Sequence, residues 1–520
     1  MVVSKRPRIL LAVALTCAIV FFTFQSRDAL ADSRQPNLSP DRIPPGSRPQ
    51  DGDSKTGSDA EQTYKLPSSA QLVAESFRLP WADSFRDHFE AVTRLKNVTM
   101  AEAKATCTWA FEDAVDFQYD NNVDWVVHER SDEEIGARRK EWQAFVDGQM
   151  IPWEMVKDKF EGRGIVVLAG NHDTTMRLKV VLRRLKVLDS SIPVEVHYWD
   201  DELSQDTMDE LASMYQPMTF NDLSQGHNII KVKKDGLFIN YQLKSAALVN
   251  SKFAEFLLLD SDNIPVIDPE FLFNSAVYQE YHSVFWPDIA RSRPQNPAWA
   301  ITNTPCRMDE YEQESGQMLV DKRRYWYHLQ LAAWLNNEHG SYYNEFLLGD
   351  KDMFRFAWHA LKTDYGRPRK WLTSVGVEND GYYCGHSFAQ HHPDDGRIAF
   401  MHGGLVKSVA LEVMRWNKEE KGGYFRHYKR APTDEDPAHN VRVGIKFDGA
   451  KYWPGRPEDT KVAMCTDMED VPARDLEEIL PGWEKAYEEI GGFWQLEQDA
   501  KAKAEKAKAD GAAADAKGGA

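Results

Sequence analysis

Two aspartates two positions apart, Asp260 and Asp262, are the residues of this sequence best suited to hold a metal ion. They follow the apolar run of residues 256–259, which predicts a fully buried strand. Such a strand delivers both carboxylates to the carboxyl edge of an open α/β sheet, where ligands bind. Because residues i and i+2 lean to the same side, the two carboxylates can converge on one hard divalent cation. A cation held in this way can bind a diphosphate and neutralise charge on a departing phosphate.

The aspartate pair also has a simpler interpretation. Aspartates are common in turns, because their side chains form hydrogen bonds with the nearby backbone. The apolar strand before the pair and the sequence Asn263-Ile-Pro after it favour the metal-binding interpretation.

The elements that position this pair alternate along the chain between strands and helices. Residues 164–169 form an apolar run that predicts a buried strand, and Gly170 and Asn171 predict a tight turn after it. The other elements expected here are strands at 193–198, 229–232 and 256–259, and helices at 178–188, 200–215 and 241–250. Four strands with helices between them predict a parallel sheet with right-handed crossovers. The predicted fold class is therefore α/β and Rossmann-like.

Aromatic and acidic residues are dense after the aspartate pair. We expect a strand at 284–288, a helix from 314 to about 336, a helix at 353–361 and a strand at 398–401. Candidates for a site lie on or beside these elements: Trp286, Asp288, Glu314, Gln317, Asp350, Asp352 and His402. Structural alternatives exist, since Trp286 could fill a core and Glu314 could be a charge at a helix N-terminus. Asp350 or Asp352 could likewise cap a helix, and His402 could be a core histidine.

The first 66 residues predict a membrane anchor followed by a tether. Residues 1–8 form a tail that ends in the basic sequence Lys5-Arg-Pro-Arg8, and residues 9–25 are uncharged, mostly apolar and near the lower length limit for a spanning helix. With the basic flank in the cytoplasm, the rest of the chain faces a lumen, which is a type II topology. Cleavage after Ala31, as for a signal peptide, is the alternative. Residues 26–66 are rich in proline and serine and predict a disordered stem. Asn37 and Asn97 lie in glycosylation acceptor sequences.

Charge and cysteine content restrict the partners and the compartment. The chain has 63 basic and 81 acidic residues, and its net charge of −18 argues against nucleic acid as a partner. An acidic protein that binds an anionic nucleotide needs local positive charge, which a metal ion can supply. Cys17 lies in the predicted anchor, and no cysteine pair has the Cys-x-x-Cys spacing of a zinc site. In an oxidising lumen the other four can form two disulfides in three pairings: Cys107, Cys306, Cys384 and Cys465.

Taken together, these motifs resemble the fungal Golgi α-1,2/α-1,3-mannosyltransferases of the Mnn type. The matching pieces lie within residues 164–407: Ala169-Gly170-Asn171, Leu258-Leu-Asp260-Ser-Asp262-Asn263, Phe285-Trp-Pro-Asp288, Glu314-Ser-Gly-Gln317, Gly349-Asp350-Lys351-Asp352 and His402. The resemblance implies a GT-A fold, GDP-mannose as donor, Mn²⁺ as cofactor, a mannosylated glycan as acceptor and a Golgi membrane address. After the stem we then expect a mainly helical region (67–160), a catalytic domain (161–440), a C-terminal extension (441–496) and a low-complexity tail (497–520).

The resemblance also assigns roles to the metal and donor candidates. Asp262, with Asp260 directly or through water, would hold Mn²⁺, and His402 would complete its coordination. The turn Ala169-Gly170-Asn171 would approach the nucleoside, and Lys244 would face the donor phosphates.

Transfer of mannose passes through a cationic, oxocarbenium-like state that a nearby carboxylate stabilises, and Asp350 and Asp352 are our candidates for it. An α-mannose donor that gives an α-linkage retains configuration, so the leaving phosphate itself can take the acceptor proton. The other candidates would contact the mannose or the acceptor: Glu314, Gln317, Trp286 and Asp288.

Two other classes of function remain open from the sequence. A metal-dependent lumenal hydrolase could use the same carboxylates with a group of histidines: His386, His391, His392 and His402. These histidines lack the spacing of a zinc-binding helix. A catalytically inactive, membrane-anchored sugar-binding protein is the third interpretation, and it would tolerate loss of the metal.

Overall fold

A computed structural model describes most of the chain after residue 83. The described ranges are 84–107, 127–232, 239–307, 309–347, 349–403, 409–431, 443–446, 465–468 and 471–518. The predicted cytoplasmic tail, anchor and stem, and Asn37, lie outside these ranges. Asn97 lies on an exposed connection. Within the described ranges, no helix combines the length and the apolar character that crossing a membrane requires.

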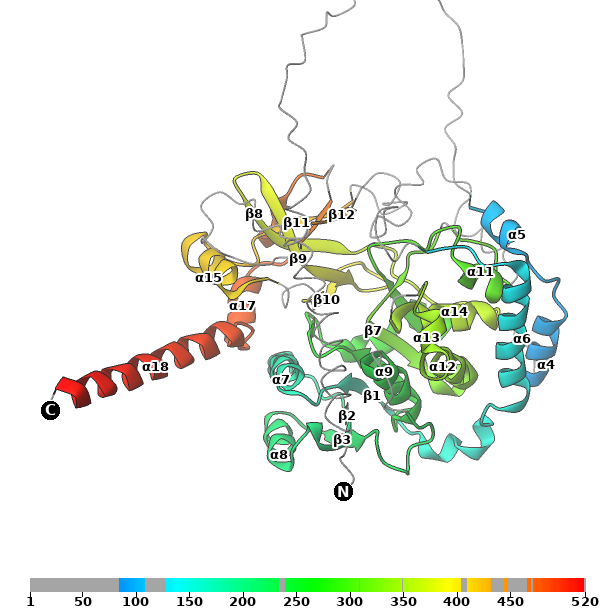
Figure 1. Cartoon of the computed structure of the whole chain (residues 1–520), viewed down its shortest axis with the longest axis horizontal. Coiled ribbons are helices and arrows are strands. Elements are labelled where there is room, and N and C mark those ends of the chain that lie inside the picture. Colours follow the sequence, from blue (N-terminus) through cyan, green and yellow to red (C-terminus); the bar gives the residue numbers. More distant parts are fainter. Residues whose placement is uncertain are drawn as a thin grey trace, which may run out of the picture. The chain divides into compact units, whose positions relative to one another are not determined.

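The aspartate pair follows the central strand of a six-stranded sheet with the order β3-β2-β1-β4-β7-β6 (Figure 1). The parallel strands are β1 (Arg163–Leu168), β2 (Val194–Tyr198), β3 (Met218–Asp222) and β4 (Glu255–Leu259). Strand β7 (Gln313–Asp321) then pairs antiparallel with β4, and β6 (Ser283–Pro287) pairs antiparallel with β7. The predicted α/β class and parallel sheet are therefore confirmed, with two antiparallel strands added.

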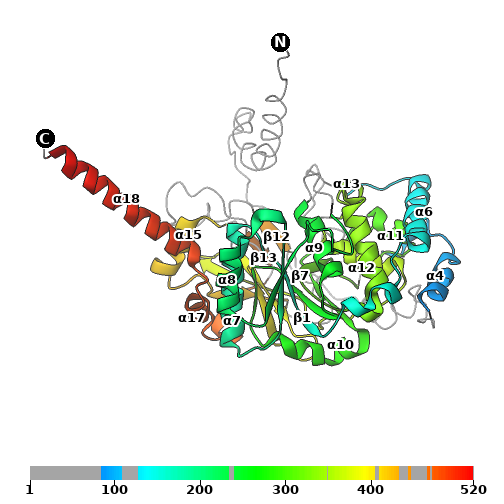
Figure 2. The same cartoon turned by 90° about the horizontal axis from the view of Figure 1, so that it is seen from below.

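Both faces of this sheet are buried, which explains the continuous apolar runs in β1 and β4. Val166 and Leu258 belong to one core, together with residues of α9 (Ile239–Asn250) and α12 (Lys322–Asn337). Val167 and Leu259 belong to a second core on the opposite face, with residues of α7 (His172–Val187). Figure 2 shows α7 on one side of β1 and α9 and α12 on the other.

A second sheet supplies the late histidine. Its main path is β12-β13-β9-β8-β11-β14, and β10 (Ile398–His402) pairs with β9 (Tyr382–His391) off that path. Strand β10 also pairs antiparallel with β5 (Asn263–Pro265), which follows directly after the aspartate pair. The remaining strands are β8 (Thr373–Asn379), β11 (His427–Lys429), β12 (Val443–Lys446), β13 (Cys465–Met468) and β14 (Arg474–Asp475).

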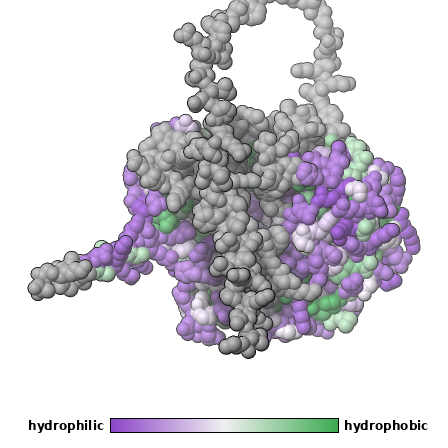
Figure 3. Space-filling view, viewed as in Figure 1, coloured by the Kyte–Doolittle hydropathy of each residue, from purple (hydrophilic) through white to green (hydrophobic). Residues whose placement is uncertain are grey.

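Helices surround the two sheets. Those not yet named are α4 (Phe85–Thr93), α5 (Met100–Ala105), α6 (Asp132–Gly148), α8 (Gln205–Met214), α10 (Ala276–Tyr281), α11 (Pro297–Ile301), α13 (Gly340–Tyr343), α14 (Lys351–Ala360), α15 (Leu411–Glu420), α17 (Trp483–Glu489) and α18 (Trp494–Gly518). Short 3₁₀ helices lie at Trp153–Met155, Lys157–Lys159, Asp200–Glu202, Pro269–Asn274 and Leu476–Glu478. The low-complexity tail falls within α18, and residues 501–510 are exposed. Figure 3 shows mainly hydrophilic residues over the described surface on one face.

Two disulfides join segments that are distant in sequence. Cys107 pairs with Cys306, and Cys384 on β9 pairs with Cys465 on β13, which selects one of the three possible pairings. The described residues, all of which follow position 83, belong to one compact unit. Because β12 and β13 share a sheet with β8 and β9, the segment after residue 440 is continuous with the preceding region rather than a separate body.

Two predicted elements are wrong. The third strand is Met218–Asp222, not residues 229–232, which form no strand. It is the edge strand and is only partly buried, so its apolar signal is weak. Residues 314–317 lie on β7 rather than in a helix, because the helix that follows begins only at Lys322, where the Asp321 side chain accepts a hydrogen bond from the Arg323 backbone. Glu314 is therefore not a helix N-terminal charge.

Candidate active site

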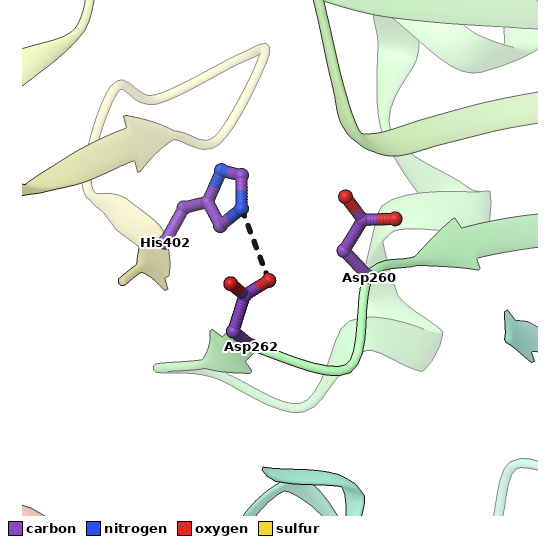
Figure 4. Close-up of side chains that lie close together, drawn as sticks. All are labelled: Asp260, Asp262 and His402. Atoms are coloured by element: carbon purple, nitrogen blue, oxygen red, sulfur yellow. Dashed lines mark ion pairs between the residues drawn. The ribbon is translucent and has the colours of Figure 1, made fainter. Parts of the chain in front are cut away.

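Asp260, Asp262 and His402 come together at the carboxyl edge of the first sheet (Figure 4). Asp260 directly follows β4, and its backbone N–H donates to Gly316 O at 2.9 Å. The β10–β5 pairing sets His402 opposite Asn263, which brings His402 Nε2 to 3.3 Å from Asp262 Oδ1. One ligand atom from each of the three side chains lies within 4.8 Å of the others. Two carboxylates and an imidazole form a donor set that suits Mn²⁺ or a similar divalent ion.

Glu314 completes the surroundings of the histidine. Its Oε2 lies 3.4 Å from His402 Nδ1, so the imidazole stands between two carboxylates. Burial disfavours the charged imidazole, but Glu314 and Asp262 outweigh it and raise the pKa of His402 well above its ordinary value. Burial also raises the pKa of Glu314, yet His402 and the Gly316 N–H together lower it to about 2. In the absence of a metal, the charge on His402 is thus balanced by acidic groups.

Gly316 makes room for the imidazole. A Cβ atom at this position would lie 2.5 Å from His402 Cε1 and 2.8 Å from Nδ1. Its carbonyl also accepts a hydrogen bond from Asn263 Nδ2 at 2.7 Å, in addition to the one from Asp260. Gly316 therefore fixes both the aspartate loop and the space for the histidine. The sequence motif contained this glycine but gave no signal of that role.

We expect Gly316→Ala to weaken binding of Mn²⁺ about 10-fold or more, since changes to groups that orient metal ligands typically cost 10–100-fold. The added methyl group must displace the His402 ring, whose neighbours on β7 are buried. Titration calorimetry with Mn²⁺ measures the effect. Gly226→Ala is the matched control, because a Cβ there meets nothing within 4 Å. Unchanged affinity in a folded Gly316→Ala protein would show that His402 takes no part in holding the ion.

Lys244 connects the aspartate pair to Asp350. Its Nζ lies 2.9 Å from Asp260 Oδ1 and 3.1 Å from Asp350 Oδ2. Burial lowers the pKa of this lysine, but the two carboxylates outweigh that and raise it above the ordinary value. The ammonium group is therefore permanently charged and held by two acids. A ligand bound at Asp260 would therefore also lie next to this ammonium group.

The two candidate catalytic carboxylates lie in different surroundings. The Asp350 side chain makes no capping hydrogen bond at α14. Burial raises the pKa of Asp350, and Lys244 partly offsets this. Asp352 is 1% exposed and accepts from Arg355 Nε at 2.8 Å, within a separate cluster that includes Glu310. Burial raises the pKa of Asp352 to about 6, against the effect of Arg355. The geometry favours Asp350 as the carboxylate of the site and a structural role for Asp352.

Trp286 and Gln317, two of the candidate sugar contacts, are buried and held by neighbouring groups. Trp286 is 1% exposed, donates from Nε1 to His391 O at 2.8 Å and packs edge-on against Phe400, as a core residue does. Gln317 is fully buried and accepts a hydrogen bond from Asn263 Nδ2. Through this hydrogen bond Gln317 helps to hold the loop that carries Asp260 and Asp262.

Asp288 is 9% exposed and forms an ion pair with Lys351 Nζ at 2.6 Å. Lys351 also pairs with Glu312, at 2.9 Å. Burial raises the pKa of Asp288, and Lys351 partly offsets this effect. A sugar at this position would meet a buried ion pair instead of a free carboxylate.

The turn after β1, residues 169–171, makes contacts within the protein itself. Ala169 is buried, and Asn171 caps α7 by accepting from Thr174 N at 3.0 Å. A Cβ at Gly170 would lie 2.6 Å from Glu202 Oε2, so the glycine accommodates Glu202. The approach of backbone to a nucleoside, expected from the sequence at this turn, would have to compete with that side chain.

The histidines of the hydrolase alternative are engaged elsewhere. His386 stacks on Tyr424 with ring centres 3.9 Å apart and bonds to Tyr424 O at 2.7 Å. His391 bonds to Thr373 Oγ1 at 3.0 Å. In the described part of the chain, Asp260, Asp262 and His402 form the one group with metal-binding geometry. The structure thus gives no second metal centre to the hydrolase interpretation within those residues.

Comparison with known proteins shows which family the central part of the chain matches. Residues 162–310 and 300–392 match the protein family described as "Mannosyltransferase putative". Alpha-1,2-mannosyltransferase MNN24 of Candida albicans is 27% identical over 309 residues, which cover 48% of this chain and 41% of that protein. Residues 162–392 of the chain therefore match a mannosyltransferase family, and the relatives include fungal α-1,2-mannosyltransferases of the Mnn type.

Other relatives extend the comparison. Alpha-1,2-mannosyltransferase MNN23 of Candida albicans is 24% identical over 327 residues, which cover 51% of the chain and 53% of the relative. The chain thus spans about half the length of the curated relatives it matches. Among solved structures, the mannosyltransferase Ktr4p from S. cerevisiae aligns with 55% of the chain and 85% of its own length, at 12% identity and a TM-score of 0.29. The family match ends at residue 392, so His402 and the C-terminal segment lie beyond it.

Proposed function

We propose that this chain is a Golgi α-mannosyltransferase with a GT-A fold. It transfers mannose from GDP-mannose to a mannosylated glycan in protein glycosylation or cell-wall mannan synthesis, with retention of configuration and dependence on Mn²⁺. The observation that carries the proposal is the group of Asp260, Asp262 and His402, next to the half-buried carboxylate of Glu314 and the buried carboxylate of Asp350. The match of residues 162–392 to a mannosyltransferase family supports the same conclusion.

The residues divide the reaction between them. Asp260, Asp262 and His402 would hold Mn²⁺, which when bound neutralises charge on the donor diphosphate. Lys244 adds a permanent positive charge beside the same position. Asp350, held by Lys244, is the carboxylate best placed to stabilise positive charge on the sugar as its bond to phosphate lengthens. The acceptor hydroxyl proton passes to the departing phosphate, so no separate protein base is required.

The anchor and address are part of this proposal. Residues 9–25 would form the signal-anchor, with the folded unit in the Golgi lumen as a single-pass type II membrane protein. The two disulfides favour an oxidising compartment such as that lumen.

We expect the purified chain, assayed against a panel of nucleotide sugars and mannosyl acceptors, to turn over GDP-mannose only with a divalent ion present. Removal of the ion by a chelator should stop turnover, and added Mn²⁺ should restore it. Activity with another nucleotide sugar alone would correct the donor. Chelator-resistant sugar binding without turnover of any donor would support the inactive sugar-binding alternative instead.

A further inference from the structure

Asp262 lines a pocket whose other lining residues do not include Glu314, Lys244 or Asp350. The empty volume of the pocket is about 540 Å³ when the open solvent at its mouth is included. Residues from distant parts of the chain line it, among them Arg177, Val180, Asp262, Tyr487, Trp494 and Gln495. Val180 and Arg177 belong to α7, whereas the last three residues come from the C-terminal segment beyond the family match.

The C-terminal wall of this pocket is fixed in place. Trp494 meets the His172 ring edge-on, with centres 6.2 Å apart, and Gln498 lies within hydrogen-bond distance of the same ring at 3.3 Å. Arg415 forms an ion pair with Asp499 at 2.5 Å and so anchors the next turn of α18. The aromatic wall is therefore built against the start of α7.

The chemistry of the lining suits a flat, partly polar ring system. Two aromatic side chains, Tyr487 and Trp494, and the aliphatic Val180 give apolar faces, while Gln495 offers both a donor and an acceptor. Arg177 supplies a positive charge, and its ion pair with Asp173, at 3.9 Å, leaves 23% of its side chain exposed. Aromatic surfaces of this kind stack on nucleobases, and cations bind phosphates.

The two sides of the aspartate pair differ in a way that orients a nucleotide sugar. The side towards β7 carries Glu314, Lys244 and Asp350, whose charges suit the reacting sugar. Asp262, which contacts the other nitrogen of His402 from Glu314, lines the pocket, whereas Glu314, Lys244 and Asp350 do not. A diphosphate held at Asp260 and Asp262 sends its two ends in different directions, so the end opposite the sugar lies towards the pocket. The turn at Gly170, the other place expected for the nucleoside, is partly filled by Glu202.

We propose that this pocket binds the nucleoside end of a nucleoside diphosphate, with the base against Trp494 and Arg177 near the ribose or phosphate. The C-terminal segment is then part of the donor site. This inference rests on the proposed function, because it takes the donor to be a nucleotide sugar.

Binding of GDP tests it without any turnover. In the presence of Mn²⁺, calorimetry should show GDP bound by the wild-type chain about 10-fold or more tightly than by Trp494→Ala, as expected for loss of one base–aromatic stack. Arg177→Ala, on the rim of the pocket, should also weaken GDP binding. Both variants should bind Mn²⁺ alone with unchanged affinity, because neither side chain is a ligand of the ion. Tyr382→Ala is the control, since this side chain is 49% exposed and belongs to another part of the surface.

Circular dichroism identifies any variant that fails to fold. If Trp494→Ala does not fold, the GDP affinity of Arg177→Ala tests the inference. The inference would be overturned if folded Trp494→Ala and Arg177→Ala bound GDP as tightly as the wild-type chain does. It would also be overturned if the wild-type chain bound no GDP. If the chain turns over GDP-mannose while both variants bind GDP normally, the pocket assignment alone fails. If GDP binds through the pocket but no sugar is transferred, the proposed activity fails and the pocket assignment stands.

Discussion

Asp262→Ala is expected to abolish Mn²⁺-dependent mannosyl transfer while the protein remains folded. The side chain is one of three that converge as potential metal ligands. Only 11% of it is exposed, but it lies against His402 and lines a pocket, so its removal leaves the hydrophobic cores intact. Its removal leaves His402 paired with Glu314 and leaves Asp260 as the remaining aspartate of the pair. Loss of a preorganised electrostatic group of this kind costs on the order of 10²–10³ in rate, and loss of the ion itself should cost more. Initial rates with GDP-mannose, beside circular dichroism, measure the effect.

Asp395→Ala is the matched control for this substitution. Asp395 also pairs with a histidine, His392, at 3.4 Å, but it is 49% exposed and belongs to a turn outside the site. We expect it to leave turnover unchanged. Near-normal turnover of folded Asp262→Ala after chelation would show that the aspartate pair does not hold a catalytic metal.

Asp350→Asn should separate binding from catalysis. Charge develops on the sugar only in the transition state, so the loss of this carboxylate should lower turnover on the order of 10²–10³. Binding of Mn²⁺ and GDP-mannose should change little, because Lys244 retains its contact with Asp260 at 2.9 Å. By contrast, Asp260→Asn and Asp262→Asn should weaken Mn²⁺-dependent binding of GDP-mannose as well. Calorimetry beside initial rates distinguishes the two classes.

Asp352→Asn is the informative comparison, because Asp352 belongs to the same short motif but pairs with Arg355 in the interior. Its variant should alter thermal stability more than turnover. If Asp350→Asn keeps full turnover, the carboxylate that stabilises the transferring sugar lies elsewhere, and Glu314 becomes the next candidate.

The sequence predicts the aspartate pair well because its signal is local. An uninterrupted apolar strand buried on both faces can end only at the sheet edge, so Asp260 and Asp262 are placed by their neighbours in the chain. The sequence predicts a helix where β7 lies, and this prediction is wrong for the opposite reason. That strand is held by pairing with β4 and β6, which is non-local, and the helical pattern of α12 extends the expected helix backwards over it.

Contacts between distant residues account for the rest. Gly316 and His402 meet only because β10 pairs with β5 and β4 pairs with β7, and no spacing in the sequence encodes that meeting. Asp350 and Asp352 differ because Asp350 precedes α14 and pairs with Lys244, whereas Asp352 lies in the first turn of α14 and pairs with Arg355. Trp494, in the wall of the pocket, lies in a C-terminal segment whose role no sequence motif indicates.

The disulfide between Cys384 and Cys465 restricts how the protein can be divided in the laboratory. A fragment that stops at residue 392, where the family similarity ends, would retain Cys384 without its partner and expose the edge of β9 that β13 normally covers. An unpaired thiol beside an open strand edge invites intermolecular cross-linking and aggregation. The same cut would also discard β10 and with it His402. The limits of family similarity are therefore not the limits of a unit that can be expressed. An expressed fragment must also include the C-terminal segment, because that segment completes the second sheet.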